Sequence, residues 1–197
     1  MRTVILGSAS PRRRRLLEAA GWNVDQQPPA IDDGLLRMDA DSAEATVAAL
    51  AWFKAAQMAV PGGNVLASIA ADTVCAVGSR LLGKPEDRSD AADMLRRIAP
   101  GRHRTLTGVC VRDRDGRRHL FVDAATVEFA EVPPEALEHY LDSEEWRGKA
   151  GAYNLADRQA AGWPIRCTGD PSTVMGLPMS RLQPMLESMA AAVGAGG

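Results

Sequence analysis

Short apolar runs alternate with segments of helical periodicity along this chain, and turn-forming residues separate them. Apolar and β-branched runs bounded by glycine, proline, asparagine or aspartate predict strands. The predicted strands lie at residues 3–7, 22–27, 65–71, 74–77, 81–82, 105–111 and 120–129, with a short one near 165. The runs at 74–77 and 81–82 form a small hairpin, and those at 105–111 and 120–129 form a longer one around Asp115-Gly116.

Five segments carry the periodicity and end signals of helices. The first begins at Ser10, a preferred N-cap residue, with Pro11 in the first helical position. The second runs from 42 to 60, where Asp41 and Glu44 resemble a capping box and Pro61-Gly62-Gly63 ends the helix. The remaining helices are predicted at 88–99, 134–141 and 180–191, followed by a frayed tail over 193–197.

This order of elements predicts an α/β fold in one domain, residues 1–197. A chain of 197 residues with 46% hydrophobic content can bury its own core. The net charge of −2 argues against general attraction to nucleic acid or acidic membrane surfaces. No apolar run approaches the roughly 20 residues of a membrane span, and the start lacks the plan of a secretory signal, so we expect a cytoplasmic protein.

Cysteine and histidine give no metal-binding pattern. The three cysteines, Cys75, Cys110 and Cys167, are far apart and form no C-x-x-C, which is typical of thiols in a reducing compartment. The three histidines show no ligand spacing either, and we interpret each as structural or as a surface residue: His103, His119 and His139.

The first predicted strand and helix are joined by a turn rich in anion-binding groups. Ser8 and Ser10 precede four consecutive arginines, residues 12–15, in the first turns of the helix. Cations there oppose the helix dipole unless an anion is present, and free backbone N–H groups at a helix N-terminus bind phosphate. Because successive helical residues point about 100° apart, at most two or three arginines can serve one ligand; a solvated basic face is the alternative.

Three further polar residues occupy suggestive positions. Lys54 lies four residues from apolar positions on both sides, so it either reaches the rim by extending its stem or points into a cleft. Asp72 is predicted at the carboxyl end of a buried strand, where α/β proteins usually bind ligands, although it could also cap a turn. Lys84 stands between a glycine and a proline on a rigid loop.

Together the candidates favour a polyphosphate pocket, because several cations and hydroxyls face few carboxylates. Neither a P-loop nor a dinucleotide-binding glycine motif is present. The candidate set comprises one carboxylate, Asp72, and the residues Ser8, Arg12, Arg13, Lys54, Lys84 and Lys149.

The sequence resembles the Maf family of nucleoside triphosphate pyrophosphatases over nearly its whole length. The matching motifs occur in the family's order: Ser8-Ala9-Ser10-Pro11-Arg12-Arg13, Leu50-Ala51 with Lys54-Ala55, Ala71-Asp72-Thr73-Val74, Leu82-Gly83-Lys84-Pro85, Ala91 to Leu95, Thr107-Gly108-Val109, Lys149-Ala150-Gly151-Ala152-Tyr153 and Val174-Met175-Gly176-Leu177-Pro178. The resemblance implies a mixed, twisted sheet with flanking helices, and two lobes around a deep cleft, as in the inosine triphosphate pyrophosphatases. It also implies cleavage between the α and β phosphates of a nucleoside triphosphate with a divalent cation, Mg²⁺ or Mn²⁺.

Site roles follow from the same resemblance. Asp72 matches the family's proton acceptor, which activates water or helps to hold the metal. Residues that match the triphosphate-binding positions are Ser8, Arg13, Lys54 and Lys84. Arg12 and Thr73 match positions tied to base choice and look like the branch that acts on dTTP and UTP.

Some stretches depart from the pattern that the sequence resembles. The pyrimidine branch usually reads Tyr-Gly-Ile-Gln-Gly where this chain has Tyr153-Asn154-Leu155-Ala156-Asp157. The usual Asp-Lys before Ala-Gly is here Gly148-Lys149, and the family's Asp-Glu pair is Asp32-Asp33. Because Ala156 cannot read a base edge, we expect relaxed selectivity. Gln159 or Arg158, on a loop predicted to be mobile, could swing in and restore it.

The expected partners are a nucleoside triphosphate and a second copy in a homodimer. Neither a specific nucleic acid nor a membrane is expected. A different class of function also uses the cationic residues: a non-catalytic, nucleotide-binding regulator of division, since Maf proteins are also described as inhibitors of septum formation. Such a regulator would need the phosphate-binding groups but not the carboxylate.

Overall fold

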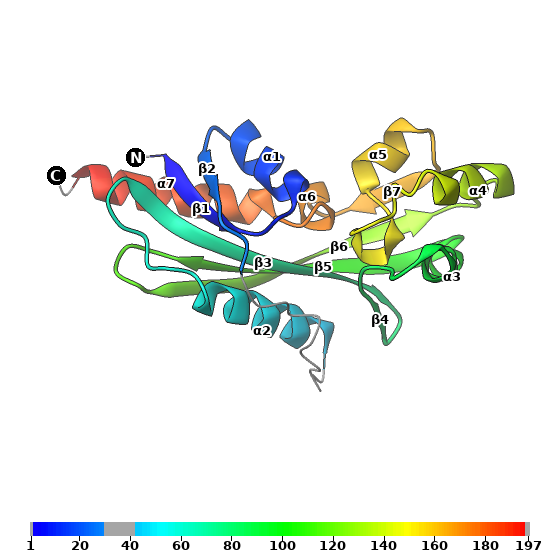
Figure 1. Cartoon of the computed structure of the whole chain (residues 1–197), viewed down its shortest axis with the longest axis horizontal. Coiled ribbons are helices and arrows are strands. Elements are labelled where there is room, and N and C mark those ends of the chain that lie inside the picture. Colours follow the sequence, from blue (N-terminus) through cyan, green and yellow to red (C-terminus); the bar gives the residue numbers. More distant parts are fainter. Residues whose placement is uncertain (1, 30–41, 196–197) are drawn as a thin grey trace.

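The computed structural model describes residues 2–29 and 42–195, which form an elongated molecule built on one mixed sheet (Figure 1). The order of its strands is β2-β1-β3-β5-β6-β7, with β4 paired to β3. The strands β1, β2 and β3 are parallel, and all other pairs are antiparallel. Their bounds are β1 (Thr3–Gly7), β2 (Asn23–Gln26), β3 (Val65–Val77), β4 (Arg80–Leu82), β5 (Gly101–Arg112), β6 (Arg118–Phe129) and β7 (Ile165–Thr168). The predicted α/β class with a mixed sheet is confirmed.

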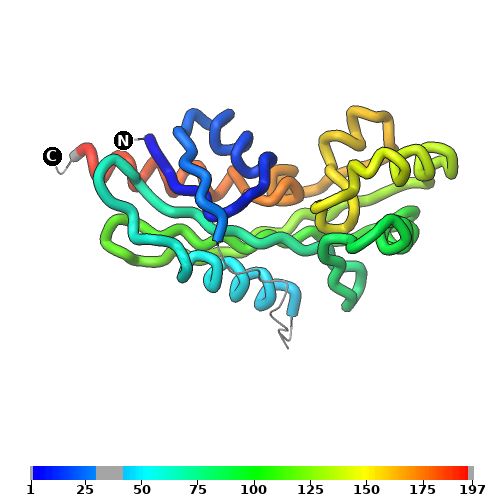
Figure 2. Tube along the Cα trace, viewed as in Figure 1, coloured from blue at the N-terminus to red at the C-terminus, as the bar shows by residue number. Residues whose placement is uncertain are grey.

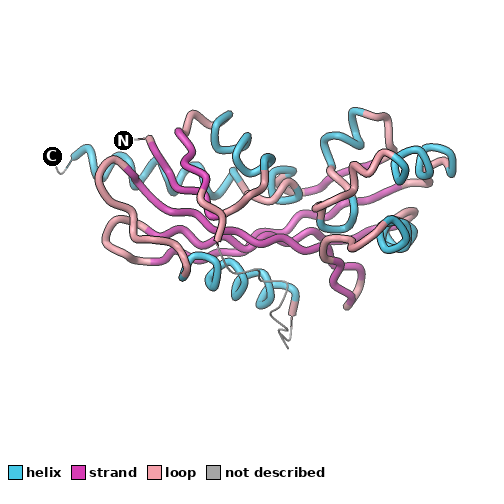
Figure 3. Tube along the Cα trace, viewed as in Figure 1, coloured by secondary structure: helices cyan, strands magenta, loops and turns pink. Residues whose placement is uncertain are grey.

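Helices cover both faces of this sheet (Figure 3). They are α1 (Pro11–Ala19), α2 (Ala43–Ala56), α3 (Arg88–Ile98), α4 (Pro134–Asp142), α5 (Leu155–Ala160), α6 (Pro171–Val174) and α7 (Met179–Ala195), with a 3₁₀ turn η2 (Ala150–Ala152). Ile5, Ala70 and Cys110 pack against α2. The residues next to them in the sequence, Leu6, Ile69 and Val109, belong to the cluster of α1 and α7. Strand alternation therefore puts α2 on one face and α1 with α7 on the other.

The hydrophobic core has two main clusters, one in each half of the long sheet. One joins β1, α1 and α7 to the first half of β3, and includes Leu17 and Trp22. The other joins the end of β3 to α3, α4 and α5, and includes Trp146 and Trp163. The long strands β3 and β6 contribute to both clusters. The half of the molecule around Leu17 and Trp22 is called the first lobe, the half around Trp146 and Trp163 the second lobe, and the two share one continuous sheet (Figure 2).

The structure corrects the prediction for residues 65–77. They form one strand, β3, rather than two strands separated at Asp72-Thr73. The antiparallel neighbour β5 pairs with β3 without interruption from Ser68 to Ala76, which holds the backbone extended through the polar pair. Asp72 is therefore inside a strand and not at its carboxyl end.

Two helices end at other positions than predicted, and short helices occupy some of the predicted loops. The second helix ends at Ala56 rather than residue 60, and its N-cap is Ser42, whose side chain accepts from the N–H of Ala45; Asp41 lies outside the described residues. The last helix continues to Ala195, where a frayed tail was predicted, because Val193 packs against the first-lobe core. Short helices α5 and α6 and the turn η2 occupy stretches that were predicted to be loops.

No helix in the described part of the chain is long and apolar enough to cross a bilayer.

The first and last described segments of the chain, residues 2–7 and 193–195, belong to the same lobe (Figure 1).

Candidate active site

A gap in the pairing of β3 opens the sheet at its centre. Strand β1 ends at Gly7, opposite Ala70, and β4 first pairs at Cys75. Among the described residues, positions 71–74 of β3 thus have a strand neighbour only on the β5 side. A cleft of about 710 Å³ lies at this gap, between the two lobes. Asp72 and Thr73 occupy the open edge, just beyond the carboxyl end of the parallel strand β1.

All the sequence-predicted site residues line this one cleft: Ser8, Arg12, Arg13, Lys54, Asp72, Thr73, Lys84 and Lys149. They come from both lobes and from both faces of the sheet. Of the arginine run, Arg12, Arg13 and Arg15 line the cleft, whereas Arg14 pairs with Glu18 at 2.7 Å. The limit of two or three arginines for one ligand is consistent with this arrangement.

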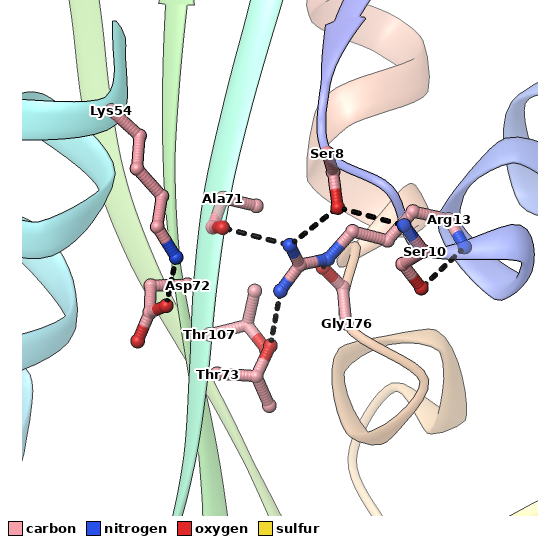
Figure 4. A network of polar contacts seen from close by, with 9 residues as sticks. All are labelled: Ser8, Ser10, Arg13, Lys54, Ala71, Asp72, Thr73, Thr107 and Gly176. Carbon is pink, nitrogen blue, oxygen red and sulfur yellow. Dashed lines mark hydrogen bonds and ion pairs between the residues drawn. The ribbon is translucent and has the colours of Figure 1, made fainter. Parts of the chain in front are cut away.

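Asp72 faces α2 and forms an ion pair with Lys54. The Lys54 Nζ lies 2.5 Å from Asp72 Oδ1, and both side chains are largely buried (Figure 4). Lys54 therefore points into the cleft rather than along the rim. Gly108, the β5 partner of Asp72 in the sheet, allows this approach, since a Cβ there would lie 2.2 Å from the Val47 carbonyl oxygen of α2. The absent side chain lets α2 pack directly on the strand.

Arg13 crosses the cleft on the opposite face of β3 (Figure 4). Its Nε donates to Gly176 O at 2.9 Å, and one terminal nitrogen donates to Ser8 Oγ at 3.1 Å and Ala71 O at 2.8 Å. The other terminal nitrogen donates to Thr73 Oγ1 at 3.0 Å. Arg13 thereby ties the β1–α1 turn, the open edge of β3 and the turn after α6 together. Its guanidinium has a positioning role in the structure as well as a charge.

The helix that carries these arginines begins as predicted. Ser10 is the N-cap, its hydroxyl oxygen accepts from the N–H of Arg13 at 3.5 Å, and Pro11 occupies the first turn. The first turn holds no acidic residue, so its cations and the helix dipole leave this wall of the cleft electropositive.

The second lobe supplies the far wall of the cleft through η2 and α5. Lys149 Nζ lies 3.8 Å from Asp157 Oδ2, and Asn154 Nδ2 donates to the same oxygen at 2.5 Å. Burial lowers the pKa of the Arg12 guanidinium and of the Lys149 ammonium, and the negative charge of Asp157 partly opposes both shifts. Arg12 of the first lobe and Asp157 of the second are thus electrostatically coupled across the cleft.

Two residues proposed from sequence to restore base selectivity lie elsewhere. Arg158 is buried on α5, where it pairs with Glu145 and lies 4.2 Å above the Tyr140 ring. Gln159 donates to Ile165 O at 3.2 Å. Neither lines the cleft, and Ala156 does not line it either. The prediction of a mobile loop here is wrong, because residues 155–160 form a helix anchored by these contacts.

The motifs and this geometry agree with comparison to known proteins. The family model for Maf-like protein matches residues 3–189. This chain belongs to the Maf family. The dTTP/UTP pyrophosphatase of Rhodopirellula baltica is 36% identical over 94% of this chain and 82% of that protein. The dTTP/UTP pyrophosphatase of Ruminiclostridium cellulolyticum is 34% identical over 96% of this chain and 97% of that protein. A solved HAM1 protein from Coxiella burnetii is 13% identical over 68% of this chain and 75% of that one, with a TM-score of 0.43.

The cleft of this Maf protein can be tested for the divalent cation that the family resemblance implies. Its described lining holds two carboxylates, Asp72 and Asp157, and the described residues contain no cluster of three His, Cys, Asp or Glu side chains placed to bind a metal. Mg²⁺ in phosphate sites is commonly held by one or two carboxylates, with phosphate oxygens and water completing its shell. Asp72 fits such a site. The acidic pair Asp32-Asp33 lies outside the described residues.

Several cleft residues were not identified from the sequence. Arg147, Asn154 and Asp157 line the second-lobe wall, and Thr105 lies beside Cys75 on the floor. Asn154 and Asp157 stand where the pyrimidine branch has glycines, so the departure from the motif was itself the available signal. Cys75 shows no sign of a nucleophile, because burial raises its pKa to about 11.

Proposed function

We propose that this Maf protein hydrolyses nucleoside triphosphates between the α and β phosphates, giving a nucleoside monophosphate and pyrophosphate. The observation that carries the proposal is the carboxylate of Asp72, which stands at the open edge of β3 within a cleft lined by arginines and lysines. The dTTP/UTP pyrophosphatase names of its relatives support the same reaction. They do not favour a non-catalytic regulator, which would have no use for the carboxylate.

In this proposal the cations hold the phosphate chain and neutralise its charge. Lys54 and Lys84 both line the cleft, and Ser8 lies at the turn before the arginine helix. Phosphoryl transfer depends mainly on positioning and electrostatic stabilisation, which such a set provides. Arg13 keeps the turn, the strand edge and the α6–α7 connection in register around the ligand.

Asp72 is the proposed general base. Its carboxylate accepts the proton of a water molecule that attacks the α-phosphorus, and Lys54 holds that carboxylate at a fixed position. A divalent cation, Mg²⁺ or Mn²⁺, would be held by Asp72 together with phosphate oxygens. When bound, it would neutralise developing charge on the phosphates. Arg12 and Thr73 are the proposed base-side contacts of the first lobe.

Separation of the reaction products tests this proposal. Purified protein is incubated with a nucleoside triphosphate and Mg²⁺ or Mn²⁺, and the products are resolved by anion-exchange chromatography. We expect equal amounts of monophosphate and pyrophosphate, and none without a divalent cation. Diphosphate and orthophosphate as the products would contradict cleavage at the α-phosphorus.

A further inference from the structure

Asp157 is the second carboxylate in the described lining of the cleft, and it lies on the second-lobe wall. It sits in the first turn of α5, with about half of its side chain exposed. A carboxylate repels a phosphate chain, so its presence in a cationic cleft needs another reason. The end of the substrate that carries no negative charge is the nucleoside. Asp157 lines the same cleft as Arg12, a proposed base-side contact, and its charge acts on that guanidinium.

The neighbours of Asp157 fix its orientation. Asn154 Nδ2 donates to Oδ2 at 2.5 Å, and Lys149 Nζ lies 3.8 Å from the same oxygen. Both contacts use Oδ2, which leaves Oδ1 for a ligand. Asn154 is itself more than nine-tenths buried, and its Oδ1 has no hydrogen-bond partner in the described structure. Because that Asn154 oxygen is buried, the acceptor that this wall presents is the half-exposed carboxylate of Asp157, beside the ammonium group of Lys149.

An ionised carboxylate can only accept hydrogen bonds. An exocyclic amino group on a base supplies N–H donors to it, as when aspartate or glutamate accepts from the N4 amino group of cytosine. Uracil and thymine have a carbonyl oxygen at that position, which would face the carboxylate as a second acceptor. The adjacent Lys149 suits a ring carbonyl beside the amino group.

We propose that Asp157, oriented by Asn154, reads the exocyclic amino group of the base and makes this cleft favour amino-bearing nucleotides over uracil and thymine nucleotides. The inference rests on the proposed function for the identity of the substrate class. It assigns base choice to a pair of residues in the second lobe, beside the first-lobe positions Arg12 and Thr73.

CTP and UTP are the matched substrates for a test, because they differ only in the amino or carbonyl group at position 4 and in the hydrogen that uracil carries on N3. We expect wild-type kcat/KM for CTP to exceed that for UTP by about tenfold, the scale of one discriminating base contact. Asp157→Asn keeps the shape and replaces one acceptor oxygen with a donor, so it should abolish or reverse this ratio. Asp93→Asn, which removes an exposed carboxylate of α3 outside the cleft, should leave the ratio unchanged.

Two outcomes would overturn the inference. One is a wild-type preference for UTP. The other is an equal loss of kcat/KM for both substrates in Asp157→Asn, which would make Asp157 only a counter-ion for Lys149 and Arg12.

Calorimetric binding of CTP and UTP without a metal separates this inference from the proposed function. A CTP preference in binding that depends on Asp157, with no hydrolysis when Mg²⁺ or Mn²⁺ is added, would support the inference and contradict the pyrophosphatase. Hydrolysis with no dependence on Asp157 would do the reverse.

Discussion

Lys54 Nζ lies 2.5 Å from Asp72 Oδ1, and the pair joins the α2 helix to residues 71–74 of β3, which have no strand neighbour on the cleft side within the described part of the chain. Both side chains are about seven-eighths buried. Removing one member of a buried pair leaves the other charge uncompensated, so neither residue can change without affecting the other. The lysine therefore restricts where the carboxylate can sit.

Asp72→Asn should reduce kcat by about 10² to 10⁴, the range for loss of a general base. Nucleotide binding should change little, because the substitution keeps the shape of the side chain. Steady-state kinetics and a separate binding titration would measure the two effects. Near wild-type turnover would mean that Asp72 has only a structural role, and Asp93→Asn serves as the control for loss of a carboxylate outside the cleft.

Lys84→Ala should raise KM for the triphosphate by about 10- to 100-fold, corresponding to the roughly 1.5–3 kcal/mol of a charged hydrogen bond. The Lys84 loop is held to the second lobe by a hydrogen bond from Gly151 N to Gly83 O at 2.9 Å, so the rest of the loop should keep its position. Arg80→Ala removes an exposed cation of β4 outside the cleft and should leave KM within twofold. An unchanged KM in Lys84→Ala would exclude Lys84 from the phosphate site.

Gly108→Ala should lower the free energy of unfolding by roughly 1–3 kcal/mol, the usual cost of overpacking. The added Cβ would meet the Val47 carbonyl at 2.2 Å and push α2 away from β5. Gly62→Ala, where a Cβ meets nothing within 4 Å, should change stability by less than about 0.5 kcal/mol. Chemical denaturation of both variants tests the packing, and equal stabilities would show that α2 yields easily.

His103 should make stability depend on pH. It is buried against Tyr153 and Phe129, and burial lowers its pKa from 6.5 to about 4. Between these values the unfolded chain binds the proton more readily, so stability is full above pH 6.5 and falls as the pH drops toward 4. The loss amounts to at most about 3 kcal/mol. Denaturation midpoints at pH 7 and pH 4.5 should show a smaller difference in His103→Gln than in wild type.

Ala156→Gln should not restore strict pyrimidine selectivity. Position 156 is exposed on α5 and outside the lining of the cleft, so the added amide would face away from a bound base. We expect the ratios of kcat/KM among dTTP, UTP, CTP, GTP and ATP to change by less than about threefold, below the roughly tenfold effect of one base contact.

In the wild type, dTTP and UTP should be accepted without a preference above about tenfold, or about 1.4 kcal/mol. A preference above a hundredfold for one base would refute the relaxed pocket.

The sequence by itself determined most of the elements and the candidate residues of the cleft, although not Arg147, Asn154, Asp157 or Thr105. Local signals are short in range, so Ser10 with Pro11 marked the first helix, and Gly116 marked the long hairpin. Motif order identified all the candidates that line the cleft, because family motifs preserve residue types whose partners are distant in the chain.

Tertiary structure decided how these residues meet. Whether Lys54 pointed along the rim or inward depended on the packing of α2 over Gly108, and no local pattern encodes that contact. The pairing of β5 held Asp72 inside an extended strand where the sequence predicted an end. The position of Asp157 beside Lys149, on the wall across from Arg12, arises only when the second lobe folds back over the sheet. Sequence spacing determines which side chains lie next to each other on one helix or strand. Which side chains of two different elements face each other depends instead on how the side chains between those elements pack.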